Sequence, residues 1–168
     1  MTPRAPTQGG FLDLSGKVAV VTGGGRGIGF AIASHMAGNG AKLVIAGRSE
    51  ATLKAAVDAL GEGTSYCIAD VAQEEGVEAL ARFVEGRYGA VDILVNNAGS
   101  NPYYKRVEDT SLEEWSAVVD VNLTGVFLCT RAFGKPMLAR GKGSIINITS
   151  IAATSGLART AAYGAAKA

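Results

Sequence analysis

The chain has 168 residues, of which 48% are hydrophobic and 18% charged, and its formal net charge is +1. A domain of this length can bury a sizeable core, and the near balance of charge favours neither nucleic acid nor an anionic membrane surface as a partner. Asn, Thr and Gly interrupt the longest apolar stretches, so that no uninterrupted run has the length of a membrane span.

The start of the chain and the cysteines indicate a soluble, cytoplasmic protein. The first ten residues, MTPRAPTQGG, lack the apolar run of a secretory signal, and we expect residues 1–12 to be a disordered leader before a domain at 13–168. Cys67 and Cys129 fall in separate apolar segments without CxxC or metal-ligand spacing. This is typical of reduced, buried thiols in a cytosolic protein.

Five short β-branched runs alternate with helical stretches. They are KVAVVT, AKLVIAG, TSYCIAD, VDILVNNAG and GSIINITS, at residues 17–22, 41–47, 64–70, 91–99 and 143–150. Such apolar runs without polar alternation are typical of parallel strands covered by helices on both faces. The pattern predicts an α/β fold with a Rossmann-type doubly wound parallel sheet.

Two of the helices have clear signals. Apolar residues recur at helical spacing over residues 27–38, where His35, the single histidine, lies at the edge of the apolar face and is expected to be a partly buried structural residue. Between Thr110 and Phe133, TSLEE supplies an N-cap and early acidic residues, and apolar side chains then fill more than one face. We expect this second helix to pack both inward and against another subunit.

The first strand runs directly into TGGGRGIG, residues 22–29. Glycines allow a tight turn and close approach to a pyrophosphate, and the free amides at a helix N-terminus supply donors for it. Gly23, Gly27 and Gly29 follow a G-x-x-x-G-x-G register. Such a turn can also merely join a strand to a helix, but its position after the first strand of an alternating pattern favours a dinucleotide site.

Arg48 follows the second strand, where NAD-binding sites place an acidic residue on the ribose hydroxyls. An arginine there suits a 2′-phosphate, and Arg26 in the glycine loop adds a second cation. The sequence therefore favours NADP as cofactor, with NAD possible. The alternative is that Arg48 only caps a solvated helix start.

Five motifs occur in a fixed order: TGGGRGIG, NNAG at 96–99, Asn122 in DVNLTG, Ser150 in NITS, and YGAAK at 163–167. With these motifs the sequence resembles the classical branch of the short-chain dehydrogenase/reductase family over nearly everything after the leader. The resemblance implies hydride transfer between a nicotinamide cofactor and an alcohol or carbonyl substrate on a single Rossmann domain. The balanced charge leaves nucleic acid and membranes out as partners, and a tyrosine acid/base with a serine donor beside it requires no metal.

The resemblance also implies a role for each matching residue. Tyr163 would be the catalytic acid/base, and Lys167 would hold the nicotinamide ribose and support the tyrosine. Ser150 would hydrogen-bond the substrate oxygen, and Asn122 would maintain a proton relay through water. The implied cofactor-binding set is Gly23, Gly25, Arg26, Gly27, Ile28, Gly29, Arg48, Asp70, Val71, Asn97, Ala98, Gly99, Tyr163 and Lys167.

Elementary chemistry supports the same pair. Tyr163 and Lys167 lie at i and i+4 on a helix and share a face, so a nearby ammonium would favour the phenolate of a side chain whose pKa is ordinarily about 10. Three alternatives stay open. Tyr163 could be a packing aromatic, Ser150 could only cap a turn, and Asn122 could only kink its helix. Exposed loop aromatics, Tyr103 and Tyr104, could line a substrate entrance.

A doubly wound sheet of this type ordinarily has about six strands, in the order 3-2-1-4-5-6. Because only five are seen, and the chain stops one residue after Lys167, we expect an incomplete sheet in a truncated, weakly stable and poorly active chain. A complete version would be a homo-oligomeric NADP-dependent reductase acting on a sugar acid, a polyol or a 3-oxoacyl thioester. The alternative is a non-catalytic dinucleotide-binding sensor or oligomer partner.

Overall fold

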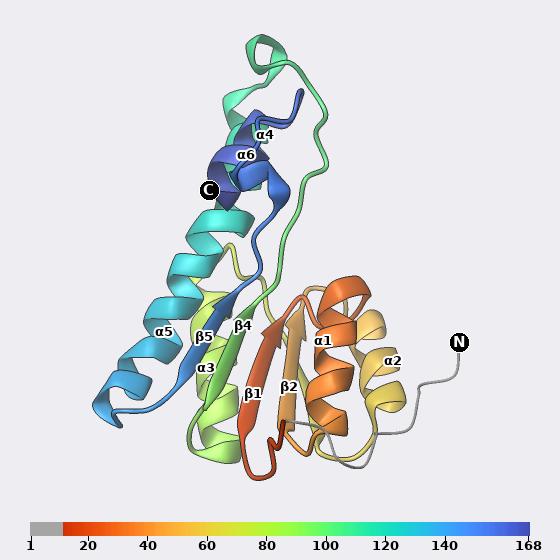
Figure 1. Cartoon of the computed structure of the whole chain (residues 1–168), viewed down its shortest axis with the longest axis vertical. Helices are drawn as coiled ribbons and strands as arrows, with labels where there is room; N and C mark the ends of the chain where they lie inside the picture. The colour runs from red at the N-terminus through yellow and green to blue at the C-terminus, as the bar shows by residue number, and fades with distance from the viewer. Residues whose placement is uncertain (1–11) are drawn as a thin grey trace.

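The computed structural model describes residues 12–168, so that the expected leader lies outside it apart from Leu12. Five parallel strands form one sheet in the order β3-β2-β1-β4-β5 (Figure 1). This confirms the predicted doubly wound α/β fold. The strands are β1 (Val18–Thr22), β2 (Lys42–Gly47), β3 (Thr64–Ile68), β4 (Ile93–Asn96) and β5 (Ser144–Asn147).

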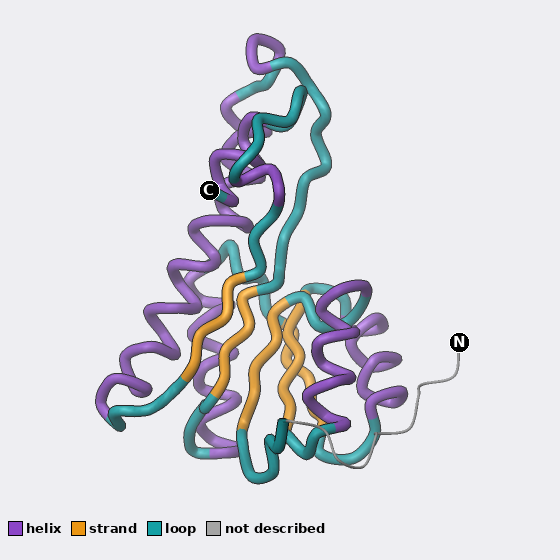
Figure 2. The backbone as a smooth tube through the Cα atoms, in the orientation of Figure 1, coloured by secondary structure: helices purple, strands orange, loops and turns teal. Residues whose placement is uncertain are grey.

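Helices cover both faces of the sheet (Figure 2). They are α1 (Gly27–Gly38), α2 (Glu50–Leu60), α3 (Glu74–Tyr88), α4 (Leu112–Val119), α5 (Gly125–Ala139) and α6 (Ala161–Lys167), with 3-10 turns at Val107–Asp109 and Ile151–Ala153. Alternate side chains of each strand point to opposite faces, so β1 sends Val20 toward α3 and α5, and Val21 toward α1 and α2. The sheet thus has a separate apolar core on each side.

Burial is uneven across the sheet. All five residues of β1 are buried, whereas β3 has none that is fully buried and β5 has only Ile145 half-buried. The prediction that all five runs are covered on both faces is therefore wrong for β3 and β5. The reason is topological, since these two strands form the edges of the sheet among residues 12–168.

The second predicted helix is longer than expected and is not uniform. Ser111 caps α4 by accepting from the backbone N–H of Glu114, whose side chain accepts from the backbone N–H of Ser111, and this confirms the predicted N-cap. A π-helical turn at Asp120–Thr124 then joins α4 to α5, which continues to Ala139. By length and composition alone this helix could cross a membrane, but that is weak evidence because its α5 part packs on the sheet like a core helix.

His35 differs from its prediction. It lies in the last turn of α1 and is exposed, and its Nδ1 is 2.9 Å from the carbonyl oxygen of Ala31. Its position on α1 directs the His35 side chain toward solvent and away from the sheet. The histidine is therefore a surface residue that hydrogen-bonds its own helix.

Candidate active site

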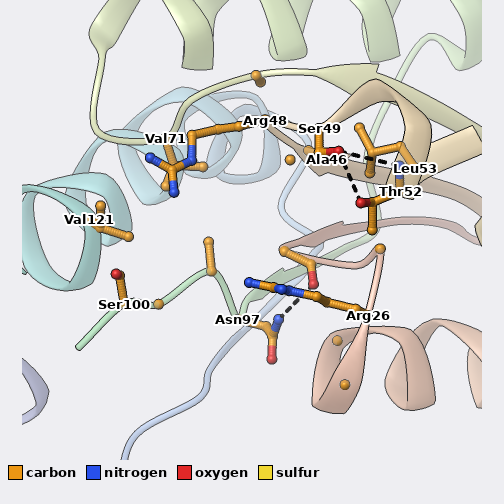
Figure 3. A pocket seen from close by; sticks show the side chains of 18 of the residues that line it. Arg26, Ala46, Arg48, Ser49, Thr52, Leu53, Val71, Asn97, Ser100 and Val121 are labelled. Atoms are coloured by element: carbon orange, nitrogen blue, oxygen red, sulfur yellow. Dashed lines mark hydrogen bonds between the residues drawn. The ribbon is translucent and has the colours of Figure 1, made fainter. Parts of the chain in front are cut away.

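A cavity of about 740 Å³ opens at the carboxyl ends of the strands, at the switch point between β1 and β4, where later strands begin to be added on the opposite side of β1 (Figure 3). Ligands of open α/β sheets bind at such a switch point. Its walls include every non-catalytic residue of the predicted cofactor-binding set, namely Gly23, Gly25, Arg26, Gly27, Ile28, Gly29, Arg48, Asp70, Val71, Asn97, Ala98 and Gly99. Residues from four separate segments of the chain therefore meet at one place.

The glycine loop is packed too closely for side chains. A Cβ on Gly29 would collide with the carbonyl oxygen of Gly23 and with Nδ2 of Asn97, and a Cβ on Gly24 would lie 2.7 Å from Ile45 on β2. Gly23 itself has φ 65°, which strains any residue with a side chain. The loop backbone thus lies directly against the sheet and leaves the space above it open.

No side chain of the first turn of α1 or of its N-cap satisfies the free backbone amides at the start of this helix. Arg26 at the N-cap makes no side-chain hydrogen bond to the helix, and no acidic residue lies in the first turn. By contrast, α2, α3 and α4 each have acidic residues in that turn. Unsatisfied amides and the helix dipole favour an anion here, so this end of the cavity fits a pyrophosphate.

Thr22 and Asn97 tie the glycine loop to the segment after β4. The Thr22 hydroxyl donates to the carbonyl oxygen of Val95 and accepts from the backbone N–H groups of Asn97 and Ala98, each at 3.0 Å. The Asn97 side-chain amide donates to the carbonyl oxygens of Thr22 and Gly23, at 2.9 and 3.3 Å. These bonds fix the two backbone walls of the cavity relative to each other.

Two guanidinium groups extend into the cavity, that of Arg48 from the β2–α2 turn and that of Arg26 from the glycine loop (Figure 3). Arg48 Nη1 lies 3.9 Å from Asp70 Oδ2. Asp70 begins the turn between β3 and α3. The part of the cavity between these turns therefore holds two cations and one carboxylate.

Glycines also support the turn that carries Asp70 and Val71. A Cβ on Gly76 would collide with the carbonyl oxygen of Asp70, and one on Gly125 would lie 2.9 Å from that of Val71. Helices α3 and α5 thus press directly on this backbone. The turn is held from both sides.

A smaller cavity of about 220 Å³ adjoins the first, since Ile28, Asn97, Gly99 and Ser100 line both. Tyr163 and Lys167 lie in its wall. The two predicted reactive side chains therefore face the far end of the cleft that starts at the glycine loop.

Lys167 is buried and held by the backbone. Its Nζ donates to the carbonyl oxygen of Ile148 at 3.0 Å, and lies 6.0 Å from the centroid of the Tyr163 ring. Burial lowers the pKa of Lys167, because the ammonium has lost part of its hydration. A Cβ on Gly99 would lie 3.5 Å from Nζ, so the segment after β4 closes over the lysine.

Asn122 lies inside the π-helical turn and is buried. Its side-chain amide donates to the carbonyl oxygens of Ser100 and Val118, at 2.6 and 2.8 Å, and its Oδ1 accepts from the backbone N–H of Ser100 at 3.3 Å. The residue thus holds the segment after β4 from the helix side. The local irregularity and the tertiary clamp occur together, as π-bulges at functional sites often show.

Ser150 follows β5 and caps a turn, which is the alternative role that the sequence left open for it. Its Oγ accepts from the backbone N–H of Ala152 at 3.2 Å at the start of a 3-10 turn. The hydroxyl hydrogen stays free to donate elsewhere. Ser150 is not in the wall of either cavity, although its neighbours Ile148 and Thr149 are.

Several wall residues were missed by sequence reasoning. They are Ala46, Gly47, Ser49, Thr52, Leu53, Ala69, Ser100 and Val121 in the larger cavity, and Asn101, Ile148 and Thr149 in the smaller. Most of these residues are adjacent in the sequence to a predicted site residue, and this adjacency was the one signal from which they could have been predicted. Tyr103 and Tyr104 line neither cavity, and Tyr104 is 69% exposed. Within residues 12–168 no three His, Cys, Asp or Glu side chains are grouped so as to hold a metal ion.

The sequence model of the short chain dehydrogenase family matches residues 17–168. The chain belongs to this family. It is 40% identical to a 3-oxoacyl-[acyl-carrier-protein] reductase FabG of Vibrio cholerae over 94% of this chain, and 41% identical to a 3-alpha-(or 20-beta)-hydroxysteroid dehydrogenase of Mycobacterium bovis over 92%. It covers 64% and 59% of the lengths of these relatives.

Solved structures agree with this assignment. The crystal structure of gox2181 has a TM-score of 0.89 and 36% identity, covering 92% of this chain and 62% of that one. A metagenomic short-chain oxidoreductase in complex with NADP has a TM-score of 0.87 and 38% identity, covering 92% and 71%. The Rossmann-type fold and the membership in an NAD(P)-dependent oxidoreductase family are therefore established together.

Proposed function

We propose that the chain carries the cofactor site and reactive residues of an NADP(H)-dependent oxidoreductase that interconverts a ketone and an alcohol. The observation that carries the proposal is that Tyr163 and Lys167 line a cavity adjoining the glycine-walled cavity at the switch point. A reaction between a bound dinucleotide and a small carbonyl compound needs this arrangement, because both reactants must meet beside the acid/base.

The larger cavity would hold the dinucleotide. The free amides at the start of α1 suit its pyrophosphate, and Asp70 and Val71, which line the same cavity, would lie beside the adenine, as the family resemblance implies. Arg48 and Arg26 suit a 2′-phosphate, which supports NADP over NAD. The NADP complex of the metagenomic relative is consistent with this choice.

Bound NADPH would supply the hydride to the carbonyl carbon. Tyr163 would give its phenolic proton to the carbonyl oxygen, so that the C=O π bond is replaced by one C–H and one O–H bond. The Lys167 ammonium, four residues on, would stabilise the phenolate that remains until solvent reprotonates it. Ser150 would donate its free hydroxyl hydrogen to the same oxygen.

Asn122 would act by holding Ser100 and the segment over Lys167. Its side-chain amide has two acceptors, the carbonyl oxygens of Ser100 and Val118, so it is placed to keep the backbone of this wall fixed. A water relay that starts at Lys167 remains part of the proposal. The Lys167 ammonium has three hydrogens, and one of them is donated to the carbonyl oxygen of Ile148. The two that remain would bind the first water of the relay.

The substrate class follows from the relatives. The 3-oxoacyl and hydroxysteroid names of two relatives favour a keto group next to a larger carbon skeleton, with sugar acids and polyols as further candidates. We also propose a cytoplasmic homo-oligomer. Leu123, Phe127 and Leu138 leave an exposed apolar face on the long α4–α5 helix that supports the subunit contact.

Two measurements test the function. Titration calorimetry with NADPH and NADH measures binding, and NADPH absorbance with a panel of ketones measures turnover. The Tyr163→Phe variant should keep NADPH affinity and lose turnover by about a hundredfold or more. Equal turnover by this variant would remove Tyr163 from the mechanism. NADPH binding without turnover of any ketone would favour the non-catalytic sensor.

A further inference from the structure

The ion pair between Arg48 and Asp70 joins two different turns across the mouth of the larger cavity. Arg48 belongs to the β2–α2 turn and Asp70 to the β3–α3 turn, and both line the cavity. Within residues 12–168, Arg48 makes no other ion pair and no side-chain hydrogen bond. The one carboxylate facing this guanidinium is therefore Asp70.

We propose that Asp70 is a specificity-determining residue that weakens the preference for NADP over NAD by neutralising Arg48. The inference rests on the proposed function, because it concerns the 2′-phosphate that Arg48 would bind. In the unpaired state Arg48 would offer its full charge to that phosphate. Paired with Asp70, it must exchange one anion for another, and the carboxylate also repels the incoming phosphate.

The two partners differ in how firmly they are held. Asp70 Oδ1 accepts from the backbone N–H of Ala72 at 3.1 Å, and Gly76 of α3 presses on the Asp70 main chain. Arg48 is 71% exposed and extends into the cavity (Figure 3). The carboxylate is thus a fixed charge and the guanidinium a movable one.

This difference decides the sign of the effect. An exposed ion pair at 3.9 Å orders a long side chain only weakly. Removing the Asp70 carboxylate should therefore change the position of the Arg48 side chain little. The removal frees a cation and takes away a nearby anion, and both changes favour the 2′-phosphate. Any contact that Asp70 would make with the adenine would be common to NADP and NAD, and it would cancel when the two affinities are compared.

Glu50 supplies a matched control. It lies two residues from Arg48 at the start of α2, but its carboxylate accepts from the Tyr66 hydroxyl at 3.1 Å and it does not line the cavity. Glu50→Gln removes the same unit of charge near the same turn without touching the pair. Any effect of net charge alone should appear in this variant.

The experiment measures NADPH and NADH dissociation constants by titration calorimetry for the wild type, Asp70→Asn, Glu50→Gln, Arg48→Gln and the double variant Arg48→Gln/Asp70→Asn. Asparagine keeps the acceptor for the N–H of Ala72, so the turn should stay folded. We expect Asp70→Asn to raise the ratio of NADPH to NADH affinity by about two- to fivefold. We expect Glu50→Gln to change this ratio of affinities by less than about twofold. Asp70→Asn should also change the ratio by less than about twofold when it is added to the Arg48→Gln variant.

The outcomes separate the two proposals. An unchanged or lower ratio in Asp70→Asn, or an equal rise in Glu50→Gln, overturns the inference, and the proposed function stands if Arg48→Gln still reduces the preference for NADPH. Absence of binding of either nucleotide to the wild type overturns the proposed function itself. Added salt should shrink the effect of Asp70→Asn, because the pair is exposed.

Discussion

Lys167 Nζ lies 6.0 Å from the centroid of the Tyr163 ring while it donates to the carbonyl oxygen of Ile148. The helix spacing brings the two side chains to one face, but the carbonyl at the end of β5 decides where the ammonium sits. A buried ammonium with one backbone acceptor keeps two hydrogens free for other partners. The lysine is therefore positioned before any ligand binds.

The burial of Lys167 predicts a pH-dependent stability. Burial lowers its pKa in the folded chain below the value of 10.5 of an ordinary lysine, so the unfolded chain binds the proton more tightly. The free energy of unfolding should therefore rise with pH between the lowered pKa and 10.5. Lys167→Met should lack this component, as measured by urea denaturation over the alkaline range. A slope unchanged in the variant would contradict the prediction.

Gly29→Ala tests the packing of the glycine loop. The added Cβ would collide with the carbonyl oxygen of Gly23 and with Asn97, so we expect a loss of about 1–3 kcal/mol in the free energy of unfolding and at least about tenfold weaker NADPH binding. Gly38→Ala in the same helix is the control. Apart from the adjoining backbone of its own helix, no heavy atom of residues 12–168 lies within 4 Å of its added Cβ, and we expect a gain of about 0.4–1 kcal/mol with NADPH affinity unchanged. Denaturation and calorimetry measure both.

Asn122→Ala tests the clamp on the segment after β4. Ser100 would lose a donor and an acceptor, and the expected loss is about 1–3 kcal/mol in the free energy of unfolding, with faster hydrogen exchange at the Ser100 amide. Asn101→Ala is the control, since the Asn101 side chain makes no hydrogen bond within the described part of the chain. Similar losses in both variants would show that Asn122 is not a special clamp.

The cysteines should differ in reactivity. Burial raises the pKa of the Cys129 thiol to about 12. Burial also raises the pKa of the Cys67 thiol, but this side chain is only half-buried and loses less of its hydration. At pH 8 only about one Cys129 in ten thousand would be a thiolate. Iodoacetamide should therefore modify Cys67 first in the folded chain, and both only after denaturation. Mass spectrometry of labelled peptides measures the order, and equal rates in the folded chain would contradict it.

Local patterns predicted most of the fold. The apolar runs gave the five strands, and the bounds of α1 agree with the predicted 27–38, because each pattern depends on residues near one another in the chain. The partial burial of β3 and β5 escaped this reasoning, and so did the orientation of His35. Both depend on neighbours that a single segment does not contain.

The site divides in the same way. The sequence by itself determined which residue types surround the cleft, since glycines, Arg48, Tyr163 and Lys167 occur in motifs whose spacing is local. Only the tertiary structure decided which polar groups meet. Asn122 contacts Ser100, and Arg48 contacts Asp70, across separate turns and helices. Such pairings arise from the packing of parallel strands and their crossovers, which bring distant strand ends to one edge of the sheet.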